Sequence, residues 1–131
     1  MVSVRLVFAI SASKQYEVYH MDMKSSLLYG YLHEEICTNH PEGYILEPTL
    51  VCRLRKSFYV LKQAPRAWYE KMDSFLLAQN FVRCKYDSNV YLHQYEDNLL
   101  IIVLYVDYLL ITGSTLASVS FIIIFVSLKQ R

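Results

Sequence analysis

Two apolar stretches in the second half of the chain are separated by a single aspartate, Asp107. Residues 99–106 read LLIIVLYV and residues 108–112 read YLLIT, both rich in β-branched and aromatic side chains. Short apolar runs of this kind are typical of buried strands, so we expect a hairpin with Asp107 at its tip. A carboxylate so close to a core needs hydrogen bonds or a cation to compensate for its lost hydration. The sequence therefore predicts a sheet with a charged residue at one strand end.

The remainder of the chain predicts both helices and strands. We expect helices over 4–14, 24–35 and 65–79, further strands over 16–23, 50–55 and 88–95, and loops at 39–44 and 47–48. The helices rest on apolar residues three and four positions apart, such as Val4, Val7 and Phe8. A turn at 95–98 should join strand 88–95 to strand 99–106. This order predicts an α+β fold, an antiparallel sheet with helices packed on one face.

Length and composition exclude several classes of protein. A chain of 131 residues is long enough for one domain. Only three glycines and three prolines occur, while 54% of the residues are hydrophobic. These values exclude a collagen-like repeat, a flexible linker and a disordered tail, which are poor in apolar residues or rich in Gly and Pro.

The formal net charge of +1 hides an uneven distribution along the chain. Residues 1–50 hold six acidic and three basic side chains, whereas residues 53–71 hold six basic side chains and one acidic one. The basic stretch indicates either a surface that binds an anion such as nucleic acid or an ordinary solvated face. Charge alone favours the solvated face.

The cysteines and histidines form no recognisable site. Cys37, Cys52 and Cys84 match neither a zinc ligand set nor a disulfide framework. We therefore expect buried free thiols, no disulfide partner and an intracellular location in the cytoplasm or nucleus. The four histidines are scattered and receive no predicted role, and the first 14 residues fit an amphipathic helix better than a signal peptide.

Residues 108–128 contain no charged side chain, which is long enough to span a bilayer. A membrane anchor is one interpretation of this segment. Six Ser, Thr and Gly residues between 112 and 120 interrupt it, and its purely apolar part, FIIIFV, is short. The interruptions favour a location away from the membrane.

Asp22 resembles Asp107 because it ends a predicted strand, in YHMDMK. Either residue alone could be a turn aspartate that hydrogen-bonds its own backbone. Two such residues at the ends of neighbouring strands favour a divalent metal site instead. Hard carboxylate oxygens suit Mg²⁺, which usually takes one or two carboxylates together with substrate phosphates.

Four motifs together resemble the reverse transcriptase domain of Copia-type retrotransposon polyproteins. They are YHMDMKSSLLYGYLHEEI, HPEGY, VCRLRKSFYVLKQAPRAWYEKMDSFL and LYVDYLLITGS. The resemblance covers residues 3–113 and implies a polymerase palm with part of the fingers, followed at 114–131 by a divergent apolar tail. It implies template-directed nucleotidyl transfer, with an RNA or DNA template-primer and deoxynucleotides as partners. We expect a truncated and degenerate copy of such a domain.

The resemblance assigns three carboxylates to the metal site of the family, and this chain keeps two of them. Asp22 matches the first and Asp107 the second, as catalytic residues and ligands of Mg²⁺. The third position is occupied by Tyr108. A phenol is neutral near pH 7 and bulkier than a carboxylate. We therefore predict that Mg²⁺ binding is weakened and that polymerase activity is lost or very weak.

The same resemblance assigns residues to the nucleotide and the nucleic acid, namely Lys24, Leu27, Tyr59, Lys62 and Arg66. Two of the family positions are altered here. Val60 replaces a glycine whose lack of a side chain lets the backbone approach the nucleotide. Leu27 replaces an aromatic residue that excludes the ribose 2′-hydroxyl. Trp68, at helical spacing with Met72, is expected to be a core residue.

Three function classes follow from the sequence. The first is a degenerate reverse transcriptase fragment. The second is a nucleic-acid-binding module without catalysis that uses the basic stretch 53–71, where cations and aromatic rings alternate. The third is a small membrane-associated protein anchored by 108–128.

Overall fold

The computed structural model describes residues 2–23, 28, 30–44, 47–58, 60–106 and 108–129. The chain divides into two compact units. The first unit comprises residues 1–24 and 72–131, and the second comprises residues 25–71. Each unit has its own backbone pairing and is considered by itself.

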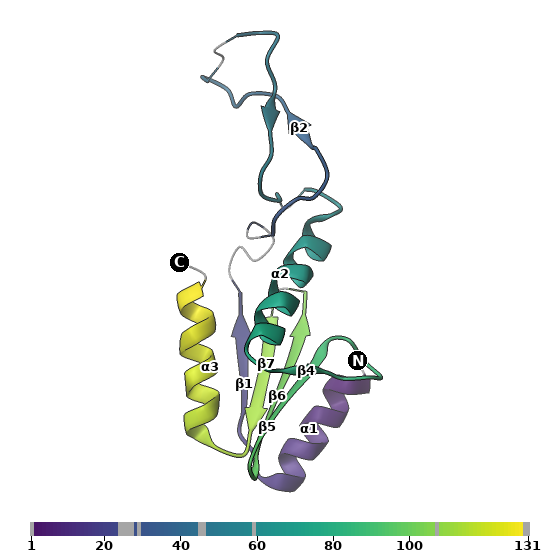
Figure 1. Ribbon diagram of the computed structural model, residues 1–131, viewed down its shortest axis with the longest axis vertical. Coiled ribbons are helices and arrows are strands. Elements are labelled where there is room, and N and C mark those ends of the chain that lie inside the picture. Colours follow the sequence, from purple (N-terminus) through teal and green to yellow (C-terminus); the bar gives the residue numbers. More distant parts are fainter. Residues whose placement is uncertain are drawn as a thin grey trace. The chain divides into compact units, whose positions relative to one another are not determined.

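The first unit is built on a five-stranded antiparallel sheet with the order β1-β7-β6-β5-β4 (Figure 1). Its strands are β1 (Val18–Asp22), β4 (Val82–Arg83), β5 (Val90–Tyr95), β6 (Asn98–Tyr105) and β7 (Tyr108–Gly113). Two-residue connections join β5 to β6 and β6 to β7, because Tyr95 pairs with Asn98 and Tyr105 pairs with Tyr108. Both predicted hairpins and the α+β class are thereby confirmed.

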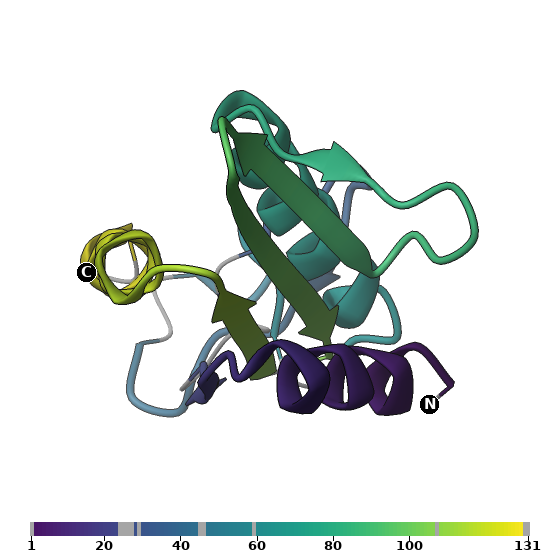
Figure 2. The same cartoon turned by 90° about the horizontal axis from the view of Figure 1, so that it is seen from below.

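Helices cover both faces of this sheet, so the prediction of helices on one face is wrong. Helix α1 (Val2–Lys14) places Val7 in a buried cluster with Val90, Ile101, Val103 and Leu110. Residues paired across the strands share a face, so the opposite face carries Tyr91, Ile102 and Ile111. Helix α2 (Ala64–Ala78), through its last two turns, and helix α3 (Leu116–Lys129) belong to that opposite face (Figure 2).

The central strand β6 is buried on both faces, which explains its unbroken apolar sequence. Residues 100–104 are each 5% exposed or less. A strand covered on only one face would alternate apolar and polar side chains, whereas this one has helices on each side. The apolar excess of the sequence therefore belongs largely to the centre of the first unit.

Side-chain hydrogen bonds fix the helices to the sheet. Ser11 Oγ of α1 donates to Thr112 Oγ1 of β7 over 3.0 Å, and both side chains are buried. On the other face, Asp73 of α2 accepts a bond from the hydroxyl of Tyr91 at 2.7 Å and two from Arg83 at 3.0 and 2.5 Å. Burial raises the pKa of Asp73, but the bonds from Arg83 and Tyr91 outweigh it and hold the pKa below its ordinary value.

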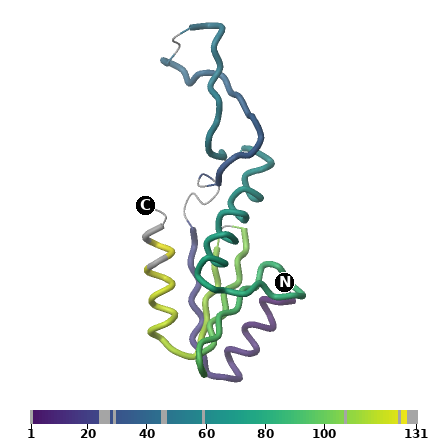
Figure 3. The backbone as a smooth tube through the Cα atoms, in the orientation of Figure 1, coloured from purple at the N-terminus to yellow at the C-terminus, as the bar shows by residue number. Residues whose placement is uncertain are grey.

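The second unit has much less regular structure. Its backbone follows a looped course with little helix or strand (Figure 3). Its ladders are β2 (Cys37–Thr38) paired with β3 (Cys52–Arg53), and an isolated bridge between Tyr31 and Lys56. The predicted helix over 24–35 is wrong where 30–35 are described, because these residues pair with a distant segment. The N–H of Leu32 donates to Arg55 O, and the N–H of Ser57 donates to Gly30 O.

Gly30 has a specific steric role in this unit. A Cβ atom at this position would lie 2.6 Å from the Cβ of Ala67 and 2.8 Å from the backbone nitrogen of Trp68. Real Cβ atoms do not approach other atoms so closely, so the chain passes α2 here only because the residue is glycine. The buried positions of Ala67 and Trp68 confirm that Trp68 is a core residue.

The segment proposed as a membrane anchor does not form one continuous helix. Residues 108–113 are strand β7, with β1 on one side and β6 on the other, and helix α3 begins only at Leu116. Among the residues that the structure describes, no helix has both the length and the apolarity needed to cross a membrane.

Candidate active site

The candidate active site lies where β1 ends and β7 begins. Asp22 is the last residue of β1 and pairs directly with Tyr108, the first residue of β7. Residues directly opposite each other on antiparallel strands have Cβ atoms about 4.5–5.5 Å apart and share a face. The two strand ends that we expected to be neighbours are therefore adjacent. Asp107 itself lies outside the described residues.

The ring of Tyr108 packs between two other aromatic rings. Its centroid lies 4.9 Å from that of His20, with the planes at 79°, and 5.0 Å from that of Tyr105, with the planes at 37°. It also packs partly buried against the core cluster under α1. Edge-to-face and tilted contacts at these distances stabilise aromatic pairs. Tyr108 is thus integrated into the packing of the sheet.

The turn between β6 and β7 requires an unusual backbone conformation. Val106 has a φ of 39°, in the left-handed region that β-branched residues rarely adopt. Two-residue hairpin loops favour positive φ because their twist then matches that of the strands. The strain at Val106 shows that the tight turn is maintained although the residue itself does not favour it.

The described side chains at this strand end do not fit a pair of metal ions. Asp22 is exposed and contributes one carboxylate. The position opposite carries the hydroxyl of Tyr108. No group of three or more His, Cys, Asp or Glu side chains that could hold a metal ion occurs in the part of the chain the structure describes. Two dications held close together need several converging carboxylates, which this donor set does not supply.

The predicted nucleotide-binding residues belong mainly to the second unit. Lys62, Arg66 and Val60 are exposed there, Val60 to 93%. Lys24, Leu27 and Tyr59 lie outside the described residues. The guanidinium of Arg66 is committed to Glu70, with Nε 2.9 Å from Oε1. This bond from Arg66 is the main reason that the pKa of Glu70 lies below its ordinary value, and His33 at 3.2 Å adds to it.

The basic stretch forms an exposed surface in the second unit. Arg53, Arg55 and Lys56 are exposed, and the first two line a hollow of about 490 Å³ with Glu34. The ring of Tyr31 has Lys56 and Lys71 Nζ at 5.9 and 5.6 Å from its centroid. These distances allow cation–π attraction. Exposed cations beside an accessible ring are the elements of a nucleic-acid surface.

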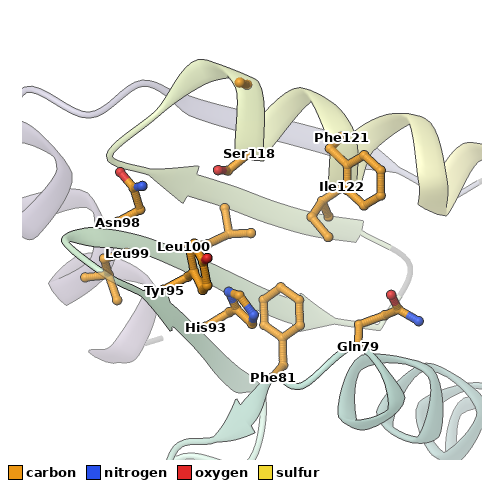
Figure 4. A pocket seen from close by; sticks show the side chains of 11 residues that line it. Gln79, Phe81, His93, Tyr95, Asn98, Leu99, Leu100, Ser118, Phe121 and Ile122 are labelled. Carbon is orange, nitrogen blue, oxygen red and sulfur yellow. The ribbon is translucent and has the colours of Figure 1, made fainter.

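A hollow of the first unit lies away from this strand end. It measures about 410 Å³ and is lined by Phe81, His93, Leu100, Phe121 and others, between α3 and the β5–β6 hairpin (Figure 4). Phe81 and His93 lie ring to ring, 5.2 Å apart, on its wall. None of the residues predicted from the sequence to act on nucleotide or metal lines it.

Two residues of the strand end were missed in the sequence, where histidines received no role. His20 precedes Asp22 by two positions, so both share one face of β1. Tyr105 faces Tyr108 across the hairpin. The alternation of side chains along predicted strand 16–23 was the signal that could have identified His20.

Comparison with known proteins identifies the family of the chain. The profile of the family described as reverse transcriptase (RNA-dependent DNA polymerase) matches residues 1–123. The chain belongs to this family. The resemblance inferred from the four motifs is thereby confirmed.

Curated relatives are retrotransposon polyproteins. The Retrovirus-related Pol polyprotein from transposon TNT 1-94 of Nicotiana tabacum is 43% identical over 116 residues, which is 86% of this chain and 9% of the relative. Those from transposons RE2 and RE1 of Arabidopsis thaliana are 35% and 34% identical over 114 residues, 86% of this chain and 8% of each relative. The chain thus spans less than a tenth of the length of each of these polyproteins. No solved structure matches it.

Proposed function

We propose that this chain is part of the palm and fingers of an RNA-directed DNA polymerase in which catalysis is lost or very weak. The observation that supports this is the pairing of Asp22 with Tyr108. The position opposite Asp22 is where a carboxylate would complete the metal site of the family. The division into a polymerase part at 3–113 and a divergent tail at 114–131 belongs to the same proposal, as does an intracellular location.

Nucleotidyl transfer depends mainly on positioning and on neutralising charge. In two-metal sites, ions about 3.5–4 Å apart stabilise the attacking and the leaving oxygen. Asp22 and Asp107 are our proposed catalytic residues and ligands for Mg²⁺, and two carboxylates suffice for one weakly held ion at most. Because the ring of Tyr108 fills the space between His20 and Tyr105, the described residues do not support the two-metal reaction.

The proposed contacts to template and nucleotide come from Lys24, Leu27, Tyr59, Lys62 and Arg66. Lys62 is exposed and has the charge needed to meet a phosphate. Arg66 must first exchange its bond with Glu70. A valine at position 60 adds a branched side chain that projects almost fully into solvent, where the family has a glycine. The bond of Arg66 to Glu70 and the valine at position 60 weaken nucleotide binding, and Lys62 does not replace the missing carboxylate.

Primer extension tests the loss of catalysis. The matching segment of the tobacco relative's reverse transcriptase would be replaced by residues 1–123 of this chain, with Tyr108 or with Tyr108→Asp. We expect the Tyr108 form to be at least about a hundredfold slower, since metal stabilisation of a transition state is worth several kcal/mol. Tyr108→Phe is the matched control and should stay inactive. Robust Mg²⁺-dependent extension by the Tyr108 form would refute the proposal.

A second function is nucleic-acid binding without catalysis, and the exposed cations of the second unit favour it. Arg53, Arg55, Lys56 and Lys62 are all exposed. Filter binding of single-stranded RNA should weaken steeply as salt rises, because bound phosphates release counterions. Arg55→Gln with Lys62→Gln should reduce the slope, whereas Lys85→Gln, an exposed lysine of the first unit, should not. Absence of binding at low salt would exclude this function.

A further inference from the structure

Cys52 and His40 form a side-chain pair in the second unit. Cys52 lies on β3 opposite Thr38, and His40 follows Thr38 by two residues. The Sγ atom of Cys52 is 3.2 Å from Nδ1 of His40, within hydrogen-bonding distance for sulfur. The thiol donates to Nδ1 when that nitrogen carries no proton. A nucleophile is therefore in direct contact with a base.

Among the described residues, the thiol of Cys52 is the polar group that contacts the imidazole of His40. The Nε2 atom of His40 is buried and has no hydrogen-bond partner among the described residues. Its Nδ1 atom meets the sulfur of Cys52. Because no other polar contact of the described chain occupies the ring, His40 is placed to accept the proton of Cys52.

The other two thiols differ from Cys52 in a way that gives a built-in comparison. Cys37 is exposed, and Cys84 is partly buried against the core under α1. Neither thiol has a hydrogen-bond partner in the described ranges. If access alone set reactivity, Cys37 would react first. If a neighbouring base set it, the half-exposed Cys52 would react first, because the thiolate is the nucleophile.

We propose that Cys52 is a reactive thiol that forms mixed disulfides with small disulfides, with His40 as its proton acceptor. The proton of the thiol moves to Nδ1, and the electron pair on sulfur attacks one sulfur of the small disulfide. A new S–S bond forms as the old one breaks, and the leaving thiolate takes the proton back from His40. Electrons balance because the small disulfide is reduced to one thiol as Cys52 is oxidised. The reaction does not depend on polymerase chemistry.

Competitive alkylation of the full chain tests this directly. Limiting iodoacetamide at pH 7, followed by peptide mass spectrometry, gives the relative rates of the three thiols in native protein and in denaturant. A free thiol is only a few per cent ionised at pH 7, so full activation is worth at most on the order of thirtyfold. We expect Cys52 to react about tenfold faster than Cys37 in native protein and equally in denaturant. Cys37 reacting first in native protein would overturn the proposal.

Two histidine variants separate the base from general effects on the unit. His40→Gln should slow Cys52 about tenfold and leave Cys37 unchanged, whereas His33→Gln, which alters an exposed histidine of the same unit, should change neither. If His40→Gln also speeds the alkylation of Cys37, the variant has disrupted the pairing of β2 with β3. The proposal is then judged from the relative rates of Cys52 and Cys37 in native and in denatured wild type. Oxidised glutathione should add to Cys52 before the other thiols, and dithiothreitol should reverse it. Addition elsewhere first contradicts the proposal.

Discussion

The two units of this chain differ in the length of their strands and in how deeply their apolar side chains are buried. In the first unit, β6 pairs along its length with β5 and β7 and is covered on both faces. In the second, strands of two residues carry the ladder, and Tyr44, Val51, Phe58 and Val60 are exposed to more than half. Stability in the first unit therefore comes from buried apolar area, and in the second from a few backbone pairs and close contacts.

The largest expected effect contrasts one buried residue with one exposed residue. Ile102→Ala, at a fully buried position of β6, should lower the free energy of unfolding by about 3–4 kcal/mol through lost burial and a cavity. Val51→Ala, at a position 57% exposed in the second unit, should change it by less than about 0.5 kcal/mol. Urea denaturation measures both. Equal losses would erase the contrast between the units.

Asp73 should have the next largest effect, because it satisfies a buried hydroxyl. Asp73→Ala removes the carboxylate that accepts the bond from the hydroxyl of fully buried Tyr91 and the bond from Arg83. We expect a loss of about 2 kcal/mol. Tyr91→Phe is the matched control, since it removes the hydroxyl as well, and it should cost less. Chemical denaturation at neutral pH gives both values.

The same carboxylate predicts a pH dependence. Its pKa is lower in the folded chain than in the unfolded chain, so its contribution is complete above the ordinary pKa near 4. The contribution is lost as the pH falls from there through the folded pKa. Asp73→Asn should flatten the decline in stability below about pH 4. A wild-type profile parallel to that of the variant in this window would contradict the assignment.

Substitution of Gly30 tests whether a close contact in the second unit contributes as much to stability as a buried core residue does. Gly30→Ala forces a Cβ into contact with Ala67 and Trp68, and overpacking of this kind costs about 1–3 kcal/mol. Hydrogen exchange should show the loss in residues 30–57 and not in β6. Gly43→Ala, where a Cβ would meet nothing within 4 Å although φ is +87°, should cost about 1 kcal/mol through backbone strain alone. Identical exchange at residues 30–57 in both variants would show that the contact is unimportant.

Tyr108→Asp should have a smaller effect on stability and a distinct response to metal. Without metal, we expect a loss of about 1 kcal/mol from the ring contacts with His20 and Tyr105 and from repulsion by Asp22. Millimolar Mg²⁺ should raise the melting temperature of the variant and not that of wild type, because only the variant places two carboxylates opposite each other. Tyr108→Asn supplies the control without charge. No difference among the three in Mg²⁺ would count against the palm assignment.

The smallest effect is expected at Glu70, on the exposed side of α2. Glu70→Gln removes the ion pairs with Arg66 and His33, and exposed pairs contribute little to stability. The melting temperature should therefore hardly move. RNA binding by the second unit should strengthen, because Arg66 is released. Weaker binding would argue that Glu70 orients Arg66 productively.

The sequence predicted the first unit well because its signals are long and local. Alternation and apolar runs located α1, β1, α2 and the two hairpins within about two residues. In α1, however, Val7 and Ser11 face the sheet while Phe8 is 47% exposed. The spacing of apolar residues alone does not show which of the adjacent residues Val7 and Phe8 faces the sheet.

Local sequence patterns predicted the second unit poorly, because its backbone pairings join residues that are distant in the sequence. Helical spacing over 24–35 predicted a helix, yet the backbone groups of 30–32 bond to residues 55–57. Intrinsic periodicity is a weak guide where tertiary pairing satisfies the same backbone groups. Strand 50–55 shortened to two residues for the same reason. The expectation of buried thiols also failed, since Cys37 is exposed and the other two are partly so.

The candidate site was predictable in its position but not in its packing. The ends of β1 and β7 could be predicted as neighbours from their flanking sequences, and the roles of Asp22 and Asp107 stay predictions. The partners of Tyr108 depend on strand register, which a single sequence does not give. The resemblance to reverse transcriptases, shown for the family, predicts the importance of position 108, which stays a prediction.

The direct pairing of Asp22 with Tyr108 also bears on how easily the chain could change in evolution. Every tyrosine codon becomes an aspartate codon when its first base changes, so a single nucleotide separates this residue from a carboxylate. The strand register and the tight turn that would present that carboxylate are already in place. A single point mutation would therefore place a carboxylate directly opposite Asp22 without any change of the fold.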